Sequence, residues 1–472
     1  MSASQNSPFV AGQRVHLTGI KGVGMTALAL CLQDLGLIVS GSDVADEYVT
    51  QDILRQRGIV PQVDFSDAVF QSPLDLLIYT GAHGGLHNPQ VVTAQKLGLP
   101  VMSQAQAVGA LMVGKLGISV CGVGGKTSTS AMIATILDYA GFKPSYCIGV
   151  GKVLNLQFPG RLDSGRHFVA EADEYLVSPG ADLTPRFMHQ KPSVIVCTNV
   201  AHDHPDAYPD LNATKTVFAN FFASLPQDGL LVLNGNSGPL RQIKLGSQST
   251  LWYGLSSPHN DWWVANNFVG EGKQMVQINS RQSETYQFTL SVPGRFNALN
   301  ALAAFIVSRY LGLKPSTILE ALQLFRGSLR RFEKVGEWGS VLLYDDYAHH
   351  PSQIFATLQA ARQWLPLYKI VVVFQPHTYS RTKILLNQFA KSFTYADQVI
   401  ITDIYASARE KPDPTISGAA LAAAVAQHHP ATVYVPQPEL PQYLKAHLKD
   451  HDALFTMGAG DIYQLHQALK HA

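Results

Sequence analysis

The stretch GISVCGVGGKTSTSAM, residues Gly117 to Met132, consists of an apolar strand, a glycine-rich turn and the start of a helix. Such a turn presents consecutive backbone N–H groups at a helix N-terminus, where they bind phosphate oxygens. Lys126 adds a positive charge for the β- and γ-phosphates, and the Thr127 hydroxyl is suited to ligate Mg²⁺. We therefore interpret the segment as a nucleoside-triphosphate site, in preference to a glycine-rich turn with a solvated lysine. Its candidate contacts are Gly122, Val123, Gly124, Gly125, Lys126, Thr127 and Ser128.

Apolar, β-branched runs alternate with segments of helical period on both sides of this stretch, which is typical of a mostly parallel α/β sheet. Between about residues 230 and 292 the sequence pattern changes to short strand-like runs separated by polar turns, namely LLVLN, TLWYG, DWWVANNFV, KQMVQIN and TYQFTLSV. This change predicts an antiparallel sheet added to the central domain. We predict an α/β protein with three domains: a Rossmann-like domain over 1–113, a P-loop-type ATPase domain over 114–327, and a Rossmann-like domain over 328–472.

The composition excludes several classes of protein. Of the 472 residues, 46% are hydrophobic and 15% charged, as in ordinary globular proteins. The 35 Lys and Arg against 34 Asp and Glu give a net charge of +1, so no overall field would attract nucleic acid or an anionic membrane. Four cysteines without a CxxC pair, no apolar run of spanning length and a polar start to the chain favour a cytoplasmic protein that is not inserted in a membrane.

Two further polar clusters in the central domain also follow apolar runs. The first is EADE, residues 171–174, whose three carboxylates would repel one another unless a cation such as Mg²⁺ lies among them. A solvated acidic turn is the alternative. The second is TNVAHDHPD, residues 198–206, which could ligate a metal, position a nucleophile or form a plain polar loop. Open α/β sheets bind their ligands at the carboxyl ends of the strands, which favours a common site for all three clusters.

The flanking domains carry weaker signals. Gly19 to Gly24 joins a predicted strand to a helix with the spacing GxxGxG, and Asp43 closes the next strand. The NAD fingerprint is GxGxxG, so the segment favours another phosphate-bearing ligand, with an NAD-dependent oxidoreductase as the alternative class. In the third domain, 345–351 and 374–381 follow strands, and the pair at 330–331 near the domain boundary could reach phosphate.

In their order along the chain, these motifs resemble those of the Mur ligases. They are HLTGIKGVGMTALAL, VSGSD, GVGGKTSTS, EADE, TNVAHDHPD, PGRFNALNALAA, RRFE, DDYAHHP, FQPHTYSRT, SARE and GAGDI, from about residue 14 to 463. The resemblance implies that ATP and Mg²⁺ activate the carboxylate of UDP-N-acetylmuramate as an acyl phosphate, which an amine then attacks. FQPHTYSRT and SARE favour L-alanine as the amine. The segment 175–191 resembles a Mur ligase that uses a tripeptide, which is the alternative.

The resemblance also implies roles for individual residues. The catalytic set would be Lys126, Glu174, His204, His349 and Arg381, and the metal set Thr127, Glu174 and His204. Asn300 would face the adenine, and Arg331 and Asp346 would bind ATP from the third domain. The sugar nucleotide would contact Gly19, Gly22, Gly24, Ser42 and Asp43. Two positions depart from the family pattern, because Gly124 and Phe296 stand where histidines are usual.

Overall fold

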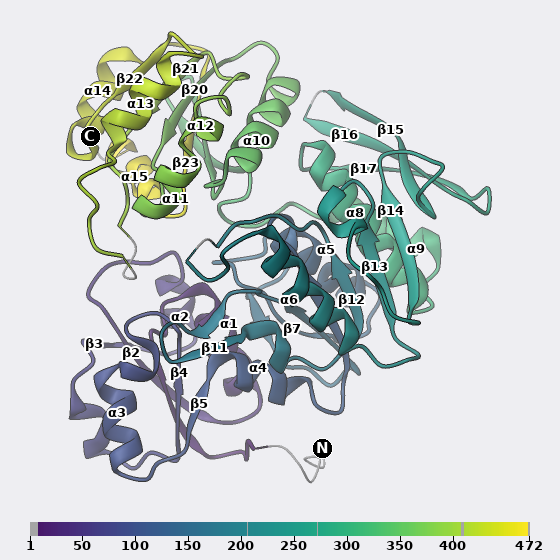
Figure 1. The fold of residues 1–472 in the computed structure, drawn as a ribbon, viewed down its shortest axis with the longest axis vertical. Helices are drawn as coiled ribbons and strands as arrows, with labels where there is room; N and C mark the ends of the chain where they lie inside the picture. Colours follow the sequence, from purple (N-terminus) through teal and green to yellow (C-terminus); the bar gives the residue numbers. More distant parts are fainter. Residues whose placement is uncertain (1–7, 205, 271, 407–409, 471–472) are drawn as a thin grey trace.

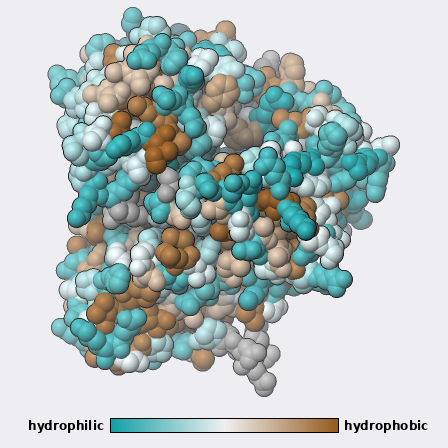
Figure 2. All heavy atoms as spheres, in the orientation of Figure 1, coloured by the Kyte–Doolittle hydropathy of each residue, from teal (hydrophilic) through white to brown (hydrophobic). Residues whose placement is uncertain are grey.

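The chain folds into three successive α/β units, each with its own main sheet (Figure 1). The computed structural model describes residues 8–204, 206–270, 272–406 and 410–470. Within these ranges no helix combines the length and the apolar character that crossing a bilayer requires. Figure 2 shows a face that is largely hydrophilic, with apolar side chains in separate small groups.

The first unit is a five-stranded parallel sheet in the order β3-β2-β1-β4-β5. Its elements are β1 (Arg14–Thr18), α1 (Val23–Asp34), β2 (Ile38–Asp43), α2 (Gln51–Gln56), β3 (Gln62–Val63), β4 (Leu76–Tyr79), α3 (Pro89–Lys96), β5 (Val101–Ser103) and α4 (Gln104–Met112). The strand order reverses between β1 and β4. Loops that follow strands at such a point border a crevice in which open sheets bind ligands.

The central unit is a ten-stranded sheet in the order β17-β16-β15-β14-β13-β12-β6-β9-β7-β8. Its first elements are β6 (Leu116–Cys121), α5 (Lys126–Tyr139), β7 (Ser145–Cys147), β8 (Gly160–Arg161), β9 (His167–Glu171), β10 (Leu176–Ser178), β11 (Asp182–Pro185), β12 (Pro192–Cys197) and α6 (Leu211–Ala223). They are followed by β13 (Leu230–Asn234), α7 (Gly238–Arg241), β14 (Ser249–Gly254), β15 (Trp262–Gly270), β16 (Lys273–Ser280), β17 (Thr285–Leu290), α8 (Arg295–Tyr310) and α9 (Pro315–Leu324). Because β6 lies between β9 and β12 and runs parallel to both, the three loops that follow these strands meet at one edge.

The antiparallel sheet predicted over about 230–292 is smaller than expected. LLVLN and TLWYG form β13 and β14, which pair in parallel with each other, and β13 pairs in parallel with β12. Within residues 230–292, antiparallel pairing is confined to β15, β16 and β17. The prediction was wrong for β13 and β14 because α7 lies between them, and the resulting crossover lets the second strand run in the direction of the first.

The third unit is a six-stranded sheet in the order β18-β19-β23-β20-β21-β22, parallel except for β18. Its elements are β18 (Glu333–Trp338), β19 (Val341–Asp346), α10 (Pro351–Trp364), β20 (Lys369–Phe374), α11 (Tyr379–Ile384), α12 (Leu386–Phe389), β21 (Gln398–Ile401), α13 (Gly418–Ala426), β22 (Thr432–Tyr434), α14 (Leu440–His447), β23 (Asp452–Met457) and α15 (Leu465–Lys470). Buried apolar side chains form two core clusters within this unit.

The first two units share a hydrophobic core. Leu28 and Cys31 of α1 belong to the same buried cluster as Cys147 of β7 and Phe168 of β9. At Gly160 in β8, an added Cβ would lie 2.0 Å from the carbonyl oxygen of Ala27 in α1. The backbones of the two units are therefore in direct contact, and no larger residue fits at this position without displacing one of them.

Candidate active site

A cavity of about 1410 Å³ lies between the three units. It is lined by the loops that follow β1 and β4 in the first unit, β6, β9 and β12 in the central unit, and β19 and β20 in the third. These are the carboxyl ends of strands, where parallel sheets bind ligands. The loops carry most of the motifs that the sequence singles out.

The glycine-rich turn of Gly122 to Gly125, here called the phosphate loop, joins β6 to the start of α5. Gly122 and Gly125 adopt positive φ angles of 120° and 90°, which strongly favours glycine at both positions. A Cβ at Gly125 would lie 2.7 Å from Oδ1 of Asn300, which places Asn300 directly against the loop. Val123, Gly124, Lys126, Thr127 and Ser128 also line the cavity.

The loop that follows β12 supports the phosphate loop. The Thr198 hydroxyl donates a hydrogen bond to the carbonyl of Gly124 (2.6 Å), and the Gly124 N–H donates to Oδ1 of Asn199 (3.0 Å). The role of Asn199 and Thr198 in supporting the neighbouring turn was missed at the level of sequence, although both belong to the TNVAHDHPD motif.

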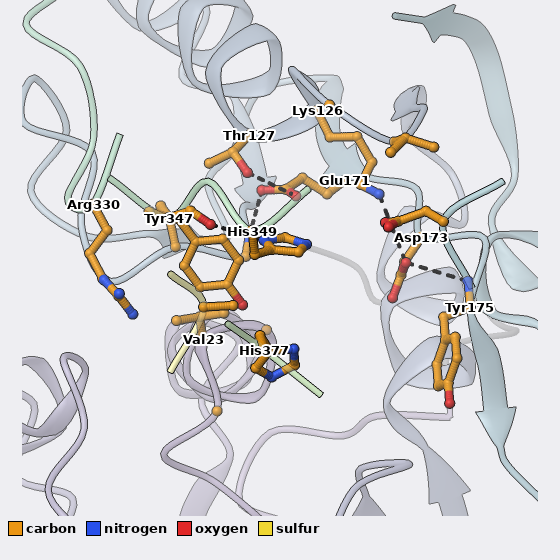
Figure 3. A pocket seen from close by; sticks show the side chains of 18 of the residues that line it. Val23, Lys126, Thr127, Glu171, Asp173, Tyr175, Arg330, Tyr347, His349 and His377 are labelled. Carbon is orange, nitrogen blue, oxygen red and sulfur yellow. Dashed lines mark hydrogen bonds and ion pairs between the residues drawn. The ribbon is translucent and has the colours of Figure 1, made fainter. Parts of the chain in front are cut away.

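Lys126 and Thr127 face different carboxylates at the end of β9 (Figure 3). Nζ of Lys126 lies 3.1 Å from Oε2 of Glu174 and 3.9 Å from Oδ1 of Asp173. The Thr127 hydroxyl donates to Oε2 of Glu171 (3.2 Å). Burial disfavours the ammonium, but the charges of Glu174 and Asp173 outweigh burial and raise the pKa of Lys126. Thr127 and Glu174, expected on one metal ion, thus have separate partners in this structure.

Asp173, Glu174 and His204 could hold a metal ion, because one potential ligand atom from each lies within 4.8 Å of the other two. Nε2 of His204 is 3.7 Å from Oε1 of Glu174, and that carboxylate oxygen is buried without a hydrogen-bond partner among the described residues. Burial would raise the pKa of Asp173, but the charges of Arg186 and Lys126 outweigh it and hold that pKa below its ordinary value. An ionised carboxylate, a buried unpartnered oxygen and an imidazole fit a hard divalent cation. Asp173 is one of the three EADE carboxylates expected around a cation, although the family resemblance did not assign it as a ligand.

Arg331 extends from the third unit into the phosphate site. Its Nη2 donates to the Thr127 hydroxyl (3.3 Å), and its guanidinium lies 4.7 Å from the Tyr347 ring centroid. The adjacent Arg330 instead donates through Nε to Asp345 (2.8 Å) and through its Nη atoms to the carbonyls of Gly458 and Gly460, inside the third unit. Of the pair expected near phosphate, only Arg331 contacts the phosphate-loop helix in this structure.

Asp346 holds the segment around Phe332 by which the chain enters the third unit. Its carboxylate accepts backbone hydrogen bonds from Phe332 (2.7 Å) and Ala348 (2.8 Å), and burial raises its pKa. Both oxygens are therefore occupied by the protein, although the residue lines the cavity.

Arg381 of the third unit lies beside a carboxylate and two histidines, Asp203, His377 and His349. Its Nη2 lies 3.3 Å from Oδ1 of Asp203, and its Nη1 is 3.2 Å from Nδ1 of His377. Nδ1 of His349 lies 2.9 Å from the Tyr347 carbonyl, which requires a proton on Nδ1 and leaves Nε2 unprotonated in the neutral ring. Burial, with the Arg381 charge adding to it, holds the pKa of His349 well below its ordinary value. A cation and a neutral imidazole thus lie close together.

The two departures from the family pattern lie near the boundary of the third unit. A Cβ at Gly124 would be 3.5 Å from Nδ2 of Asn199 and 3.8 Å from Nε2 of Gln353 in α10, so the position is not filled by other side chains. Phe296 packs against a core cluster of the third unit. Ser407 to Arg409 of the SARE motif lie outside the described residues, while Glu410 accepts a hydrogen bond from the backbone of Tyr379 (2.7 Å) at the start of α11.

In the first unit only part of the predicted set faces the cavity. Gly19, Gly22 and Gly24 line it. Ser42 and Asp43 do not, because Ser42 bonds to Gln90 (2.5 Å) and Asp43 accepts the backbone N–H of Lys21 (2.7 Å) beneath the loop. They shape the turn and are not exposed to a ligand in this structure.

A phosphate-binding turn beside three carboxylates, with cationic side chains facing it from a separate unit, defines the class of nucleoside-triphosphate-dependent enzymes. The cavity is large enough for a nucleotide together with further substrates, and its polar lining comes from all three units.

Comparison with known proteins gives the family. Three family models match in succession: "Mur ligase family, catalytic domain" over residues 14–115, "Mur ligase middle domain" over 120–308, and "Mur ligase, glutamate ligase domain" over 330–460. A UDP-N-acetylmuramate--L-alanine ligase of Thermosynechococcus vestitus is 39% identical over 95% of this chain and 94% of its own. The chain belongs to the Mur ligase family, which favours a ligase over the nicotinamide-dependent alternative.

Two solved structures resemble the whole chain. The UDP-N-acetylmuramate-alanine ligase of Thermotoga maritima has a TM-score of 0.81 at 26% identity and covers 97% of this chain and 98% of its own. A murein peptide ligase of Psychrobacter arcticus has a TM-score of 0.73 at 24% identity, with 98% of both chains covered, and shares the fold.

Proposed function

We propose that this protein is the ligase that joins L-alanine to UDP-N-acetylmuramate with hydrolysis of ATP, through an acyl phosphate, in the synthesis of peptidoglycan precursors. The observation that carries the proposal is the single cavity in which the Lys126 phosphate loop faces Arg331 and Arg381 of another unit. The named relatives support this substrate pair. The three proposed domains, 1–113, 114–327 and 328–472, would bind the sugar nucleotide, ATP and the amino acid.

Phosphoryl transfer needs positioning and charge neutralisation more than covalent help from the protein. We assign Lys126 to the transferred phosphoryl group and the N–H groups of Gly122 to Gly125 to the other phosphates. Arg331 would stabilise the developing charge from the third domain, and Asn300 would face the adenine. Asp346, whose oxygens are both bonded to the backbone, would act by holding the segment that bears Arg331.

Mg²⁺ fits the donor set of Glu174, His204 and Asp173, whereas the Thr127 hydroxyl donates to Glu171. The ion would neutralise phosphate charge there. The unpartnered Oε1 of Glu174 supports this assignment, because a buried carboxylate oxygen without a donor is costly to leave unpaired.

In the second half-reaction the amine of L-alanine attacks the acyl carbon, and phosphate leaves. Arg381 would bind the L-alanine carboxylate, for which its guanidinium geometry is suited. His349, held neutral by burial, would contact the amino acid through the unprotonated Nε2. The loop at Gly19, Gly22 and Gly24 would receive the diphosphate of the sugar nucleotide.

Phosphate release tests the proposal directly. The purified protein is mixed with UDP-N-acetylmuramate, ATP and Mg²⁺, and then with either L-alanine or the tripeptide L-alanyl-γ-D-glutamyl-meso-diaminopimelate. We expect release that depends on L-alanine, with UDP-N-acetylmuramoyl-L-alanine identified by mass spectrometry. Release with neither amine would reject the ligase assignment.

A tripeptide acceptor is the second candidate function. Residues 175–191 support it, because this segment resembles the corresponding part of a tripeptide-using Mur ligase in sequence. In the structure the segment forms the β10–β11 hairpin, whose strands pair through Leu176 and Ser178, and the chain that returns to β12. Phosphate release with the tripeptide alone would move the assignment to it.

A further inference from the structure

Residues 175–191 form an arm that extends from the central unit onto the first unit. The arm contains β10, β11 and a short 3₁₀ helix, η3 (Arg186–His189). The Leu86 N–H donates to the Ser178 hydroxyl (3.1 Å), and a Cβ at Gly81 would lie 2.4 Å from the carbonyl oxygen of Val177. The arm thus closes over the loop that follows β4, on the first-unit side of the cavity.

Arg186 of this arm is held in place at two of its three nitrogens. Nε donates to the Leu176 carbonyl (3.1 Å), and Nη1 donates to Oδ2 of Asp173 (2.9 Å). The guanidinium also lies 5.6 Å from the centroid of the Tyr175 ring. Nη2 lies 3.0 Å from a Cβ position at Gly81 and has no hydrogen-bond acceptor within the described part of the chain. Arg186 therefore presents a free, pre-oriented donor at the lining of the cavity.

The other arginines that line the cavity within the described ranges have different surroundings. Arg330 is bonded inside the third unit, Arg331 reaches Thr127, and Arg381 pairs with Asp203. Arg186 is the one that lies between Lys126 of the phosphate loop and Gly81 of the first unit, which is the unit proposed to bind the sugar nucleotide.

Asp173 shows what this position can bind. One oxygen of its carboxylate is 2.9 Å from Nη1 of Arg186, and the other is 3.9 Å from Nζ of Lys126. The two cations are therefore close enough for an anion of carboxylate size to lie near both. A carboxylate that attacks the phosphoryl group held by Lys126 has to lie in this region, since reacting atoms must approach to about 3–3.5 Å.

We propose that Arg186 binds the lactyl carboxylate of UDP-N-acetylmuramate through Nη2 and orients it toward the γ-phosphoryl group of ATP. This inference rests on the proposed function and names a substrate-binding residue for it. One carboxylate oxygen forms the new bond to phosphorus while the bond from phosphorus to the β,γ-bridging oxygen breaks and ADP departs. The second oxygen stays with Arg186. No proton or electron is transferred in this step.

The test compares two sugar nucleotides that differ only in the lactyl group. Dissociation constants for UDP-N-acetylmuramate and UDP-N-acetylglucosamine are measured by calorimetry with saturating Mg²⁺ and a non-hydrolysable ATP analogue. The proteins are the wild type, Arg186→Gln, Arg186→Lys, and Leu183→Ala as a control on the exposed part of the same arm. Binding of the ATP analogue and the melting temperature are recorded first for each protein.

We expect Arg186→Gln to weaken UDP-N-acetylmuramate about 10- to 100-fold, the size of a lost hydrogen bond to a charged group, while UDP-N-acetylglucosamine is unaffected. Arg186→Lys should recover part of the loss, and Leu183→Ala should bind both ligands as the wild type does. Equal weakening of both sugar nucleotides, no weakening of either, or an equal loss for the ATP analogue would overturn the proposal. Failure of the wild type to bind UDP-N-acetylmuramate would instead reject the proposed function.

Discussion

The central unit meets its two neighbours in opposite ways. Toward the first unit it shares a hydrophobic core, and backbone touches backbone at Gly160 and Ala27. Toward the third unit, apart from Phe296 at its boundary, it presents polar contacts across the cavity, such as Arg381 with Asp203 and Arg331 with Thr127. Separation of the central unit from the first unit would expose apolar surface, whereas the polar contacts with the third unit can exchange with water or ligands. Changes at the shared core should therefore alter stability, and changes around the cavity should alter turnover.

The largest effect is expected for Lys126→Ala in the phosphate loop. Loss of the ammonium should lower kcat by at least about 100- to 1,000-fold, because the charge acts where negative charge develops during transfer. Phosphate release gives kcat, and thermal melting should stay close to the wild type. Lys244→Ala, at an exposed position of the same unit, is the matched control. Near-normal turnover in Lys126→Ala would remove this residue from phosphoryl transfer.

Arg381→Ala tests the polar interface from the third unit. If its guanidinium binds the carboxylate of L-alanine, kcat/KM for L-alanine should fall about 10- to 100-fold while KM for ATP changes little. Initial rates at varied L-alanine and varied ATP separate the two. Lys383→Ala on the same helix, whose side chain is half exposed and pairs with Asp413, is the control. An equal rise in both KM values would argue against a role at the amino acid.

Gly160→Ala tests the shared core. The new methyl group would lie 2.0 Å from the Ala27 carbonyl oxygen, so the units must shift and unfolding should become easier by about 1–3 kcal/mol. Urea titration measures this change, and kcat/KM of the folded enzyme should stay within about twofold of the wild type. Gly238→Ala, where an added Cβ meets nothing within 4 Å, should leave stability unchanged. Lost activity with unaltered stability in Gly160→Ala would contradict the assignment of this contact to stability.

The smallest effect is a pH dependence from the first unit. Burial lowers the pKa of His16 to about 4, below its ordinary value of 6.5. Between these values the unfolded chain binds a proton that the folded chain does not, so this contribution is complete above about pH 6.5 and is lost as the pH falls toward 4. We expect a loss of about 1–2 kcal/mol between pH 7 and pH 5.

Urea titrations at both pH values measure that loss, and His16→Asn should reduce it. His447→Asn, at an exposed position, should leave the pH dependence as in the wild type. An identical slope for wild type and His16→Asn would contradict the assignment to His16.

The sequence was informative where chemistry follows a buried strand. Because β6, β9 and β12 are adjacent, the motifs that follow them converge, and Lys126, Glu174 and His204 do lie close together. The three-unit α/β architecture was likewise predictable from alternating strand and helix patterns. The resemblance to the Mur ligases is confirmed by the family comparisons. The proposed domain limits and residue roles stay predictions.

Side-chain partners between distant segments could not be read from spacing. Whether Thr127 meets Glu171 or Glu174 depends on the turn at the end of β9, and the contact of Arg331 with Thr127 depends on how two units pack. The position of Arg186 depends on the arm lying against Gly81, for which the sequence offers no motif. The edge strand β18, with charged residues in EKVGEW, lacks the apolar pattern that marks the inner strands.

The entry to the third unit fixes the direction of Arg331. Its neighbours Arg330 and Phe332 adopt positive φ angles of 60° and 50°, and bonds to Asp345 and Asp346 hold them there. Non-glycine residues keep this conformation only where the surroundings enforce it. The backbone at Arg331 is therefore fixed to the third unit, and a rotation of that unit would move the guanidinium into or out of the phosphate site. A single side chain would then couple nucleotide occupancy to the orientation of the whole unit.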